Sequence, residues 1–348
     1  MTTKAILDDL REWTGPDLRI MEVCGTHTAA IMQSGLRSLL PTGITLISGP
    51  GCPVCITPAA YVDKAVELAM RPNYRLYAFG DMLKVKGTDK SLSDAKADGG
   101  HVRFVYSPLD LLGFAEKEPQ FTHVFAAVGF ETTAPIYGML VKKAYEKGLP
   151  NLEILTALRT ILPALELILE SGDPIDAFLA PGHVSAIIGS AGYSDLAQRY
   201  QRPFSVAGFS PEHILYAIWQ LAHAVRNGRH DVCNLYPGVV HQEGNLKALA
   251  LLDDVFESGP SAWRGIGILP GSGLFLRNKY AAFDAGSHGL DADPPPNPAC
   301  RCTDVILGRI HPTACPLFGT ICTPGCAQGP CMVSAEGACG IWHRFRGE

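Results

Sequence analysis

The sequence has no apolar run approaching the 18 or so residues that are needed to cross a bilayer. Its first residues are interrupted by Lys4, Asp8 and Asp9, so they do not form the apolar region of a signal peptide. Basic residues are scattered and the net charge is -5, which leaves no electrostatic surface for nucleic acid. We therefore expect a cytoplasmic protein without a membrane or nucleic-acid partner.

Three common ligand-binding motifs are also missing. The sequence contains no Gly-x-Gly-x-x-Gly, Walker-type or nucleophile-elbow motif, which argues against a dinucleotide-binding protein, a P-loop protein and an α/β-hydrolase. Hydrophobic residues make up 47% of the 348 positions and charged residues only 18%. This composition predicts compact globular structure, and the chain length predicts two or three domains.

Short apolar stretches alternate with helix-like stretches from residue 18 to about 208, which predicts parallel sheets covered by helices. An acidic, proline-containing tract at 116–120 divides the expected strands four and four. We therefore expect two small parallel-sheet α/β domains at 1–118 and 119–235, and a helical, Cys-rich domain at 236–348. The expected strands are Leu18–Val23, Ile44–Ser48, Tyr74–Phe79, Val102–Tyr106, His123–Val128, Leu152–Ala157, Ala177–Ala180 and Phe204–Ala207. Helices are expected later, at Glu212–Arg226 and Asn245–Phe256.

Cysteine is concentrated near the end of the chain. In a reducing compartment such clustering is typical of a metal site rather than of disulfides. Soft thiolates select zinc or iron-sulfur clusters, and the tail lacks the Cys-x-x-Cys pairs of common zinc sites. Its wide, unequal gaps favour a [4Fe-4S] cluster, with structural zinc as the alternative. Seven of the eleven cysteines lie after residue 299: Cys300, Cys302, Cys315, Cys322, Cys326, Cys331 and Cys339.

Further polar motifs follow the expected strands. Because ligands of parallel sheets bind at the carboxyl ends of the strands, we expect these motifs to form one site. The motifs are Cys24-Gly-Thr-His27-Thr, Gly49-Pro-Gly-Cys52-Pro-Val-Cys55, Gly129-Phe-Glu131-Thr-Thr and Pro181-Gly-His183.

Cys52 and Cys55 are three residues apart at the expected start of a helix, a spacing that permits a disulfide. The helix terminus would favour the thiolate of Cys52, which makes it a nucleophile or a soft metal ligand. The alternative is a pair of ordinary buried thiols.

Cys24 directly follows an expected strand, and His27 could serve it as a base or a proton donor. Glu131 could move protons near these cysteines or orient His27. The alternatives are structural: a buried thiol, a hydrogen-bonded core histidine, and a helix cap formed by the threonines after Glu131. For His183 a functional and a structural role are both open, and the structural interpretation is preferred.

Several of these motifs together resemble the HypD family of hydrogenase maturation factors. The resemblance covers residues 18 to 342 and rests on 21–28, 49–55, 129–133, 315–319 and 332–339. It implies two similar α/β domains and a third that holds the cluster. It also implies a scaffold on which the Fe(CN)2CO unit of [NiFe]-hydrogenase is assembled, in complex with the chaperone HypC and served transiently by HypE, the cyanide donor.

The resemblance also implies roles for individual residues. Cys24 would bind iron together with a cysteine of HypC, and Cys52 and Cys55 would form a redox pair that also binds iron. The family's spacing assigns the [4Fe-4S] ligands and leaves Cys302, Cys326 and Cys331 as further thiols, while Cys233 matches no motif and is interpreted as a packed apolar thiol. The assigned cluster ligands are Cys300, Cys315, Cys322 and Cys339.

The resulting hypothesis is that electrons from the cluster open a Cys52–Cys55 disulfide, whose thiolates then hold iron while cyanide and CO are attached. Two other functions fit the same residues. One is a [4Fe-4S]-dependent thiol-disulfide oxidoreductase, in which Cys24 would be dispensable. The other is a zinc-stabilised binding module without redox chemistry.

Overall fold

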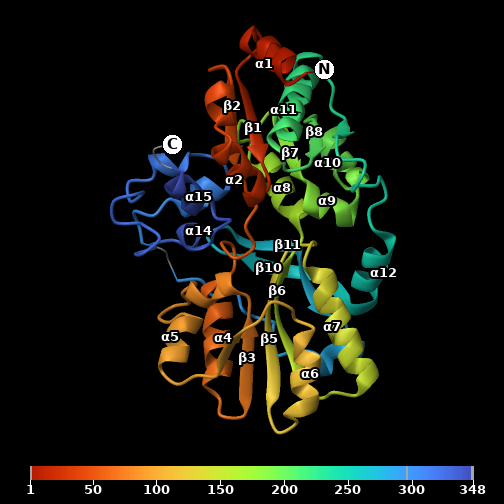
Figure 1. Ribbon diagram of the computed structural model, residues 1–348, viewed down its shortest axis with the longest axis vertical. Coiled ribbons are helices and arrows are strands. Elements are labelled where there is room, and N and C mark those ends of the chain that lie inside the picture. The colour runs from red at the N-terminus through yellow and green to blue at the C-terminus, as the bar shows by residue number, and fades with distance from the viewer. Residues whose placement is uncertain (1, 295–296, 346–348) are drawn as a thin grey trace. The chain divides into compact units, whose positions relative to one another are not determined.

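The computed structural model describes residues 2–294 and 297–345, which group into two compact units (Figure 1). Each unit is built from separate stretches of the chain. Unit 1 comprises Met1–Cys52, Ala164–Leu246 and Pro298–Glu348, and unit 2 comprises Pro53–Pro163 and Lys247–Asn297.

Unit 1 contains a five-stranded sheet in the order β2-β1-β7-β8-β9, in which every neighbouring pair is parallel. β1 and β2 are in register from Leu18 opposite Ile44 to Glu22 opposite Ser48. Four of the five residues in each of these strands are buried, as expected of a parallel sheet covered on both faces. The strands are β1 (Leu18–Glu22), β2 (Ile44–Ser48), β7 (Ala177–Pro181), β8 (Phe204–Ala207) and β9 (Val232–Asn234).

Helix α11 shows why the helices of unit 1 form where they do. Ser210 caps its first turn by accepting a hydrogen bond from the His213 amide, and Pro211 occupies the first helical position. Its buried face contributes Ile214, Ile218 and other residues to the core that also contains β1 and β2. The helices are α1 (Thr3–Arg11), α2 (Gly25–Gln33), α3 (Leu36–Leu39), α9 (Gly182–Ile188), η2 (Ser190–Tyr193), α10 (Ser194–Tyr200) and α11 (Pro211–Arg226).

Unit 2 contains a six-stranded sheet in the order β10-β11-β6-β5-β3-β4. The four strands from β6 to β4 are parallel, with helices on either side of them in Figure 1. The strands are β3 (Tyr74–Ala78), β4 (Val102–Phe104), β5 (Thr122–Gly129), β6 (Leu152–Arg159), β10 (Phe256–Trp263) and β11 (Gly267–Leu276). The helices are α4 (Ala59–Met70), η1 (Gly80–Lys84), α5 (Leu92–Ala97), α6 (Asp110–Lys117), α7 (Ala134–Lys147), α12 (Leu246–Val255) and η3 (Asn278–Phe283). Helix α8 (Ile161–Glu170) continues from unit 2 into unit 1.

Strands β10 and β11 form an antiparallel hairpin that the sequence did not predict. Glycine and proline are frequent in this segment and are normally rare inside strands. The ladder tolerates Pro260 because the register shifts between Gly259 and Ser261, which leaves the proline outside a regular pair.

The tail of the chain belongs to unit 1 and has little regular structure. Its short helices are α13 (Cys302–Ile306), η4 (Pro312–Ala314), α14 (Pro330–Val333) and α15 (Ala338–Arg344). Apart from the cysteines, its buried apolar residues are Val305, Ile306, Leu307, Leu317, Phe318, Met332 and Ile341. Such a segment needs stabilisation beyond its own packing.

The predicted fold class is confirmed, because two parallel-rich α/β sheets are followed by a Cys-rich C-terminal region. The division along the chain differs from the predicted domains 1–118, 119–235 and 236–348, of which residues 1, 295–296 and 346–348 lie outside the described residues. The first sheet combines β1 and β2 with strands that begin at Ala177, so its pairing joins segments that are distant in sequence. Throughout 2–294 and 297–345, no helix combines the length and apolarity that a bilayer span requires.

Candidate functional site

In unit 1, the motifs that follow β1, β2 and β7 lie at the same edge of the sheet, because these strands are neighbours and parallel. Cys24 follows β1, Cys52 follows β2, and His183 follows β7. Sequence reasoning placed these residues at strand ends, and the strand order brings the strand ends together. The structure therefore assembles Cys24, Cys52 and His183 on one side of unit 1.

Cys24 occupies the N-cap position of α2, in extended backbone conformation. Burial raises the pKa of its thiol, and hydrogen bonds from the His27 amide and the Thr26 side chain and amide offset part of that effect. The thiol is therefore protonated at neutral pH. A cysteine binds metal as the thiolate, so metal binding at this position would require the thiol to lose its proton.

Two glycines bring other segments against Cys24. A Cβ atom at Gly51 would lie 2.7 Å from the Cα atom of Cys24, closer than real Cβ contacts occur. A Cβ atom at Gly25 would lie 2.9 Å from the Cβ atom of Glu336 in the tail. Both glycines are thus needed for close backbone approach, and they join the Cys52 turn, Cys24 and the tail within one unit.

Cys52 and Cys55 form a disulfide, since both are oxidised and the other nine cysteines, all within the described residues, form none. Both are buried, with 6% and 1% of their surface exposed. The predicted helix start at Cys52 is wrong: a turn covers 53–56 and α4 begins only at Ala59. Pro58 occupies its N-cap with the extended φ and ψ that precede a helix, so the dipole argument for a Cys52 thiolate fails.

His27 is completely buried, and its Nε2 lies 3.0 Å from the carbonyl oxygen of Gly208, which requires Nε2 to carry the proton. Its Nδ1 is buried and has no hydrogen-bond partner among the described residues. Burial lowers the pKa of His27 to about 4, so the ring is neutral at pH 7. It can accept a hydrogen bond through Nδ1 but is a weak base.

Phe209 links the two histidines of this edge. Its ring centroid lies 4.8 Å from that of His27 and 4.1 Å from that of His183. Burial lowers the pKa of His183 as well. The structural interpretation of His183 fits this packing, because its ring contact is with an aromatic side chain.

Glu131 lies in unit 2, between β5 and α7. Its Oε1 accepts a hydrogen bond of 2.9 Å from the Ile161 amide at the start of α8, while its Oε2 is buried without a hydrogen-bond partner among the described residues. Burial raises the pKa of Glu131 to about 7. The carboxyl therefore exchanges a proton near neutral pH.

The helix cap was predicted on the wrong residue. Thr133 is the N-cap of α7 but makes no side-chain capping bond, and its hydroxyl donates instead to the Phe130 carbonyl. Glu131 takes the capping role, at a different helix. Sequence reasoning could not find this, because α8 begins thirty residues further along the chain.

Six tail cysteines form a connected group of thiols, which we call the tail thiol group: Cys300, Cys302, Cys315, Cys322, Cys331 and Cys339. The Sγ atoms of Cys302 and Cys331 are 2.6 Å apart, and those of Cys331 and Cys339 are 3.3 Å apart. A hydrogen bond with Cys302 and then burial raise the pKa of Cys300. Burial is the main cause that raises the pKa of Cys322. Electrostatic repulsion from Cys339 and Cys315 raises it further.

The remaining tail cysteine, Cys326, is exposed and accepts a hydrogen bond from Gln328. The donor set of the tail thiol group is entirely sulfur, in a segment with little core of its own, which fits an iron-sulfur cluster. Cys302 and Cys331, which the family spacing left aside, belong to the group as well. Among 2–294 and 297–345, no three or more histidine, cysteine or carboxylate side chains are arranged to hold a single metal ion.

Glu22 and Arg37 support the site, and sequence reasoning missed both. The Glu22 carboxylate at the end of β1 is completely buried and pairs with Arg37 at 2.6 Å. The Arg37 guanidinium also lies 4.8 Å from the Trp342 ring centroid in the tail helix α15. The ion pair therefore holds the end of β1, α3 and the tail together. The sequence did offer one signal for this ion pair, because Glu22 is an acidic residue within the apolar stretch that precedes Cys24.

Comparison with known proteins agrees with the resemblance. The family model described as "HypD: Hydrogenase formation hypA family" matches residues 1–346. The hydrogenase maturation factor HypD of Escherichia coli K12 is 43% identical over 333 residues, covering 94% of this chain and 89% of the relative. That of Rhizobium leguminosarum bv. viciae is 44% identical over 341 residues, covering 94% and 88%. HypD1 of Bradyrhizobium diazoefficiens is 42% identical over 339 residues, covering 94% and 89%. The chain therefore belongs to the HypD family of hydrogenase maturation factors.

Proposed function

We propose that this protein is a scaffold and redox protein on which the Fe(CN)2CO unit of [NiFe]-hydrogenase is assembled. The observation that carries the proposal is the convergence of sulfur within unit 1. Gly51 packs directly on Cys24 and precedes Cys52, while Gly25 packs on Glu336 of the tail. Iron prefers such soft ligands, and two separate segments supply them next to each other.

Iron is the cargo in this proposal, and Cys24, Cys52 and Cys55 are its ligands. Cys24 contributes a thiol that deprotonates when iron binds. Reduction of the Cys52–Cys55 disulfide takes up two electrons and two protons and breaks the S–S bond, which yields two thiols. The disulfide thus withholds two of the three sulfur ligands until electrons arrive.

The tail thiol group is the proposed place for the [4Fe-4S] cluster, with Cys300, Cys315, Cys322 and Cys339 as ligands. A bound cluster would supply single electrons at low potential. The chain itself supplies a group of thiols and the contact of Gly25 with Glu336, which attaches the tail to the segment that carries Cys24.

His27 and Glu131 have different roles in this proposal. The Nδ1 of neutral His27 has no partner among the described residues and is free to accept a hydrogen bond at the same end of α2 as Cys24. Glu131 can hold or release a proton close to neutral pH. We assign it to proton exchange during assembly.

We further propose HypC as the stable partner and HypE as the transient cyanide donor, in the cytoplasm. Support comes from membership of the maturation-factor family, because maturation requires partner proteins. Nine cysteines without disulfides are consistent with a reducing compartment.

The thiol-disulfide oxidoreductase is the second candidate, and the Cys52–Cys55 disulfide is the observation that favours it. Both sulfurs are more than nine-tenths buried, which hinders direct attack by a bulky external thiol. We therefore prefer the scaffold. The zinc-stabilised module has no comparable support, since the tail of this chain lacks the Cys-x-x-Cys pairs of common zinc sites.

Infrared spectroscopy of the protein copurified with HypC tests the scaffold, because CN and CO stretches fall where protein is silent. We expect these bands in the wild type and in Cys233→Ala, a control at a partly buried thiol on β9. We expect them to be lost in Cys24→Ala and weakened in Cys52→Ala. Unchanged bands and hydrogenase maturation in both site variants would disprove the proposal.

Metal and sulfide analysis of anaerobic protein tests the cluster separately. We expect iron and acid-labile sulfide, with both reduced in Cys315→Ala and retained in Cys326→Ala, the exposed control. Zinc without sulfide would instead support the binding module. Full disulfide reductase activity in Cys24→Ala would support the oxidoreductase.

A further inference from the structure

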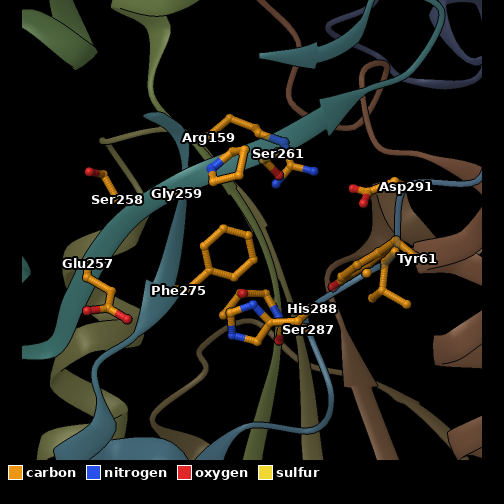
Figure 2. Close-up of a pocket in the computed structure, with 14 residues that line it drawn as sticks. Tyr61, Arg159, Glu257, Ser258, Gly259, Ser261, Phe275, Ser287, His288 and Asp291 are labelled. Atoms are coloured by element: carbon orange, nitrogen blue, oxygen red, sulfur yellow. The ribbon is translucent and has the colours of Figure 1, made fainter. Parts of the chain in front are cut away.

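Unit 2 contains a cavity of about 240 Å³ that the proposed function does not use (Figure 2). Its walls come from α4, β6, β10, β11 and the segment after η3. Thr156 and Arg159 of β6 are buried in its wall, whereas Glu257, His288 and Asp291 are exposed and form the rim. All of these residues belong to the same compact unit.

Arg159 carries a buried positive charge that no contacting carboxylate neutralises. Its guanidinium donates to the carbonyl oxygen of Ala262 through Nε at 3.2 Å and Nη2 at 2.8 Å, and to that of Leu158 through Nη1 at 3.1 Å. Three of the five N–H groups that an arginine possesses are thus used, each on a neutral oxygen. Within the described part of the chain, no ion pair includes Arg159, although only 5% of its surface is exposed.

The Asp291 carboxylate on the rim attracts the Arg159 charge but makes no ion pair with it, so the buried charge is only partly compensated. A ligand that bonds the guanidinium would complete the compensation. Burial lowers the pKa of Arg159 to about 10, so the group keeps its charge at neutral pH. A cationic group at the wall of an open cavity, with two N–H groups left over, is suited to an anion with two oxygens.

Thr156 provides the second polar group. Its Oγ1 is buried and lacks a hydrogen-bond partner among the described residues, and 4% of the residue is exposed. Strand β11 pairs with β6 only at Leu158 and Arg159, and the Thr156 amide donates instead to Ser287 at 2.8 Å. The Thr156 amide is therefore satisfied, while its hydroxyl is a buried polar group without a partner in a residue of the cavity wall.

The rim decides which anion fits. The rings of Phe275 and His288 stack at 4.5 Å and form a flat wall, and Figure 2 places Glu257 and Asp291 on opposite sides of that pair. These two carboxylates repel a multiply charged phosphate more than a single carboxylate. They also favour a ligand that carries an ammonium or hydroxyl group at its other end.

We propose that this pocket binds a small carboxylate, whose oxygens bond the Arg159 guanidinium and the Thr156 hydroxyl. The cavity equals the liquid volume of about eight water molecules, which limits the ligand to a small metabolite. None of the residues that line the cavity is a cysteine, and the observations that support the site are independent of iron assembly.

Fluorine NMR of trifluoroacetate added to the full chain tests the proposal. We expect its line to broaden with wild-type protein and to sharpen when acetate is added. Arg159→Gln should weaken binding at least tenfold, as expected for a lost hydrogen bond to a charged group. Arg277→Gln is the control, because Arg277 is an arginine of unit 2 that pairs with Asp253 and does not line the cavity.

Thr156→Val gives a second test that does not depend on how well Arg159→Gln folds. Valine matches the shape of threonine and removes an unsatisfied buried hydroxyl, so the stability should stay equal or rise while binding weakens about fivefold. Equal broadening in wild type, Arg159→Gln and Thr156→Val would overturn the proposal. Stronger displacement by inorganic phosphate than by acetate would overturn the carboxylate assignment.

Discussion

Replacing Glu131 by glutamine should change how the stability of this protein depends on pH. Burial raises the pKa of Glu131 from 4.5 to about 7 in the folded protein. Between these values the folded state keeps a proton that the unfolded chain has lost. The free energy of unfolding therefore falls as pH rises through this window, by about 3 kcal/mol in total if one pKa unit corresponds to about 1.4 kcal/mol.

Glutamine has no charge at any pH in this range. It can still accept the hydrogen bond from the Ile161 amide, so the N-terminus of α8 stays capped. We expect the variant and the wild type to be equally stable near pH 4.5, and the variant to be more stable by about 3 kcal/mol near pH 8. Glu146→Gln is the control, because Glu146 is an exposed carboxylate on α7.

Urea denaturation at several pH values measures this difference. Trp263 is the tryptophan of unit 2, and its ring centroid lies 5.9 Å from that of Phe130, the neighbour of Glu131. Its fluorescence therefore reports on the relevant unit. Parallel loss of stability with pH in the wild type and Glu131→Gln would refute the reasoning, because it would show that Glu131 is ionised throughout.

Three further predictions concern the sulfur site. Gly51→Ala should destabilise unit 1 by about 1–3 kcal/mol and impair hydrogenase maturation, because its Cβ would approach the Cys24 backbone; normal thermal unfolding and normal maturation would contradict this. Arg37→Met should cost about 3–5 kcal/mol, measured by urea denaturation, because it leaves the buried Glu22 carboxylate unpaired; a loss below about 1 kcal/mol would mean that the pair is dispensable. With a pKa near 4, His27 should show no NMR titration at neutral pH, and protonation of the unfolded chain should lower stability as pH falls from 6.5 towards 4.

Much of the fold could be predicted from local sequence patterns. The expected strands Ile44–Ser48 and Phe204–Ala207 match β2 and β8 residue for residue, and α11 differs from its prediction by one residue. These segments are apolar stretches with strong end signals, such as the Ser210 cap and Pro211. β10 and β11 were missed because Gly and Pro weaken the strand pattern, whereas the hairpin is stabilised by its own pairing, by pairing with β6 and by burial of Phe256 and Leu276 in the core.

The sequence placed the candidate cysteines at strand ends, but it could not show their local surroundings. The sequence indicated Cys24, Cys52 and Cys55, and the family match agrees with the motifs that contain them. It allowed a Cys52–Cys55 disulfide, which the structure contains, but it also placed Cys52 at a helix start that favours a thiolate, whereas the structure has a turn there. His27 appeared suitable as a base, yet its pKa depends on burial by Phe209 and Gly208, which lie far along the chain.

The sequence by itself determined the class of fold and the family of the protein. Apolar periodicity and cysteine spacing are local properties, so one chain read in order is enough to recognise them. Tertiary structure alone decided which strands pair, which thiols meet and which side chains lose water. These depend on contacts between distant segments, such as Gly25 with Glu336 or Glu131 with Ile161, and burial in such contacts sets each pKa.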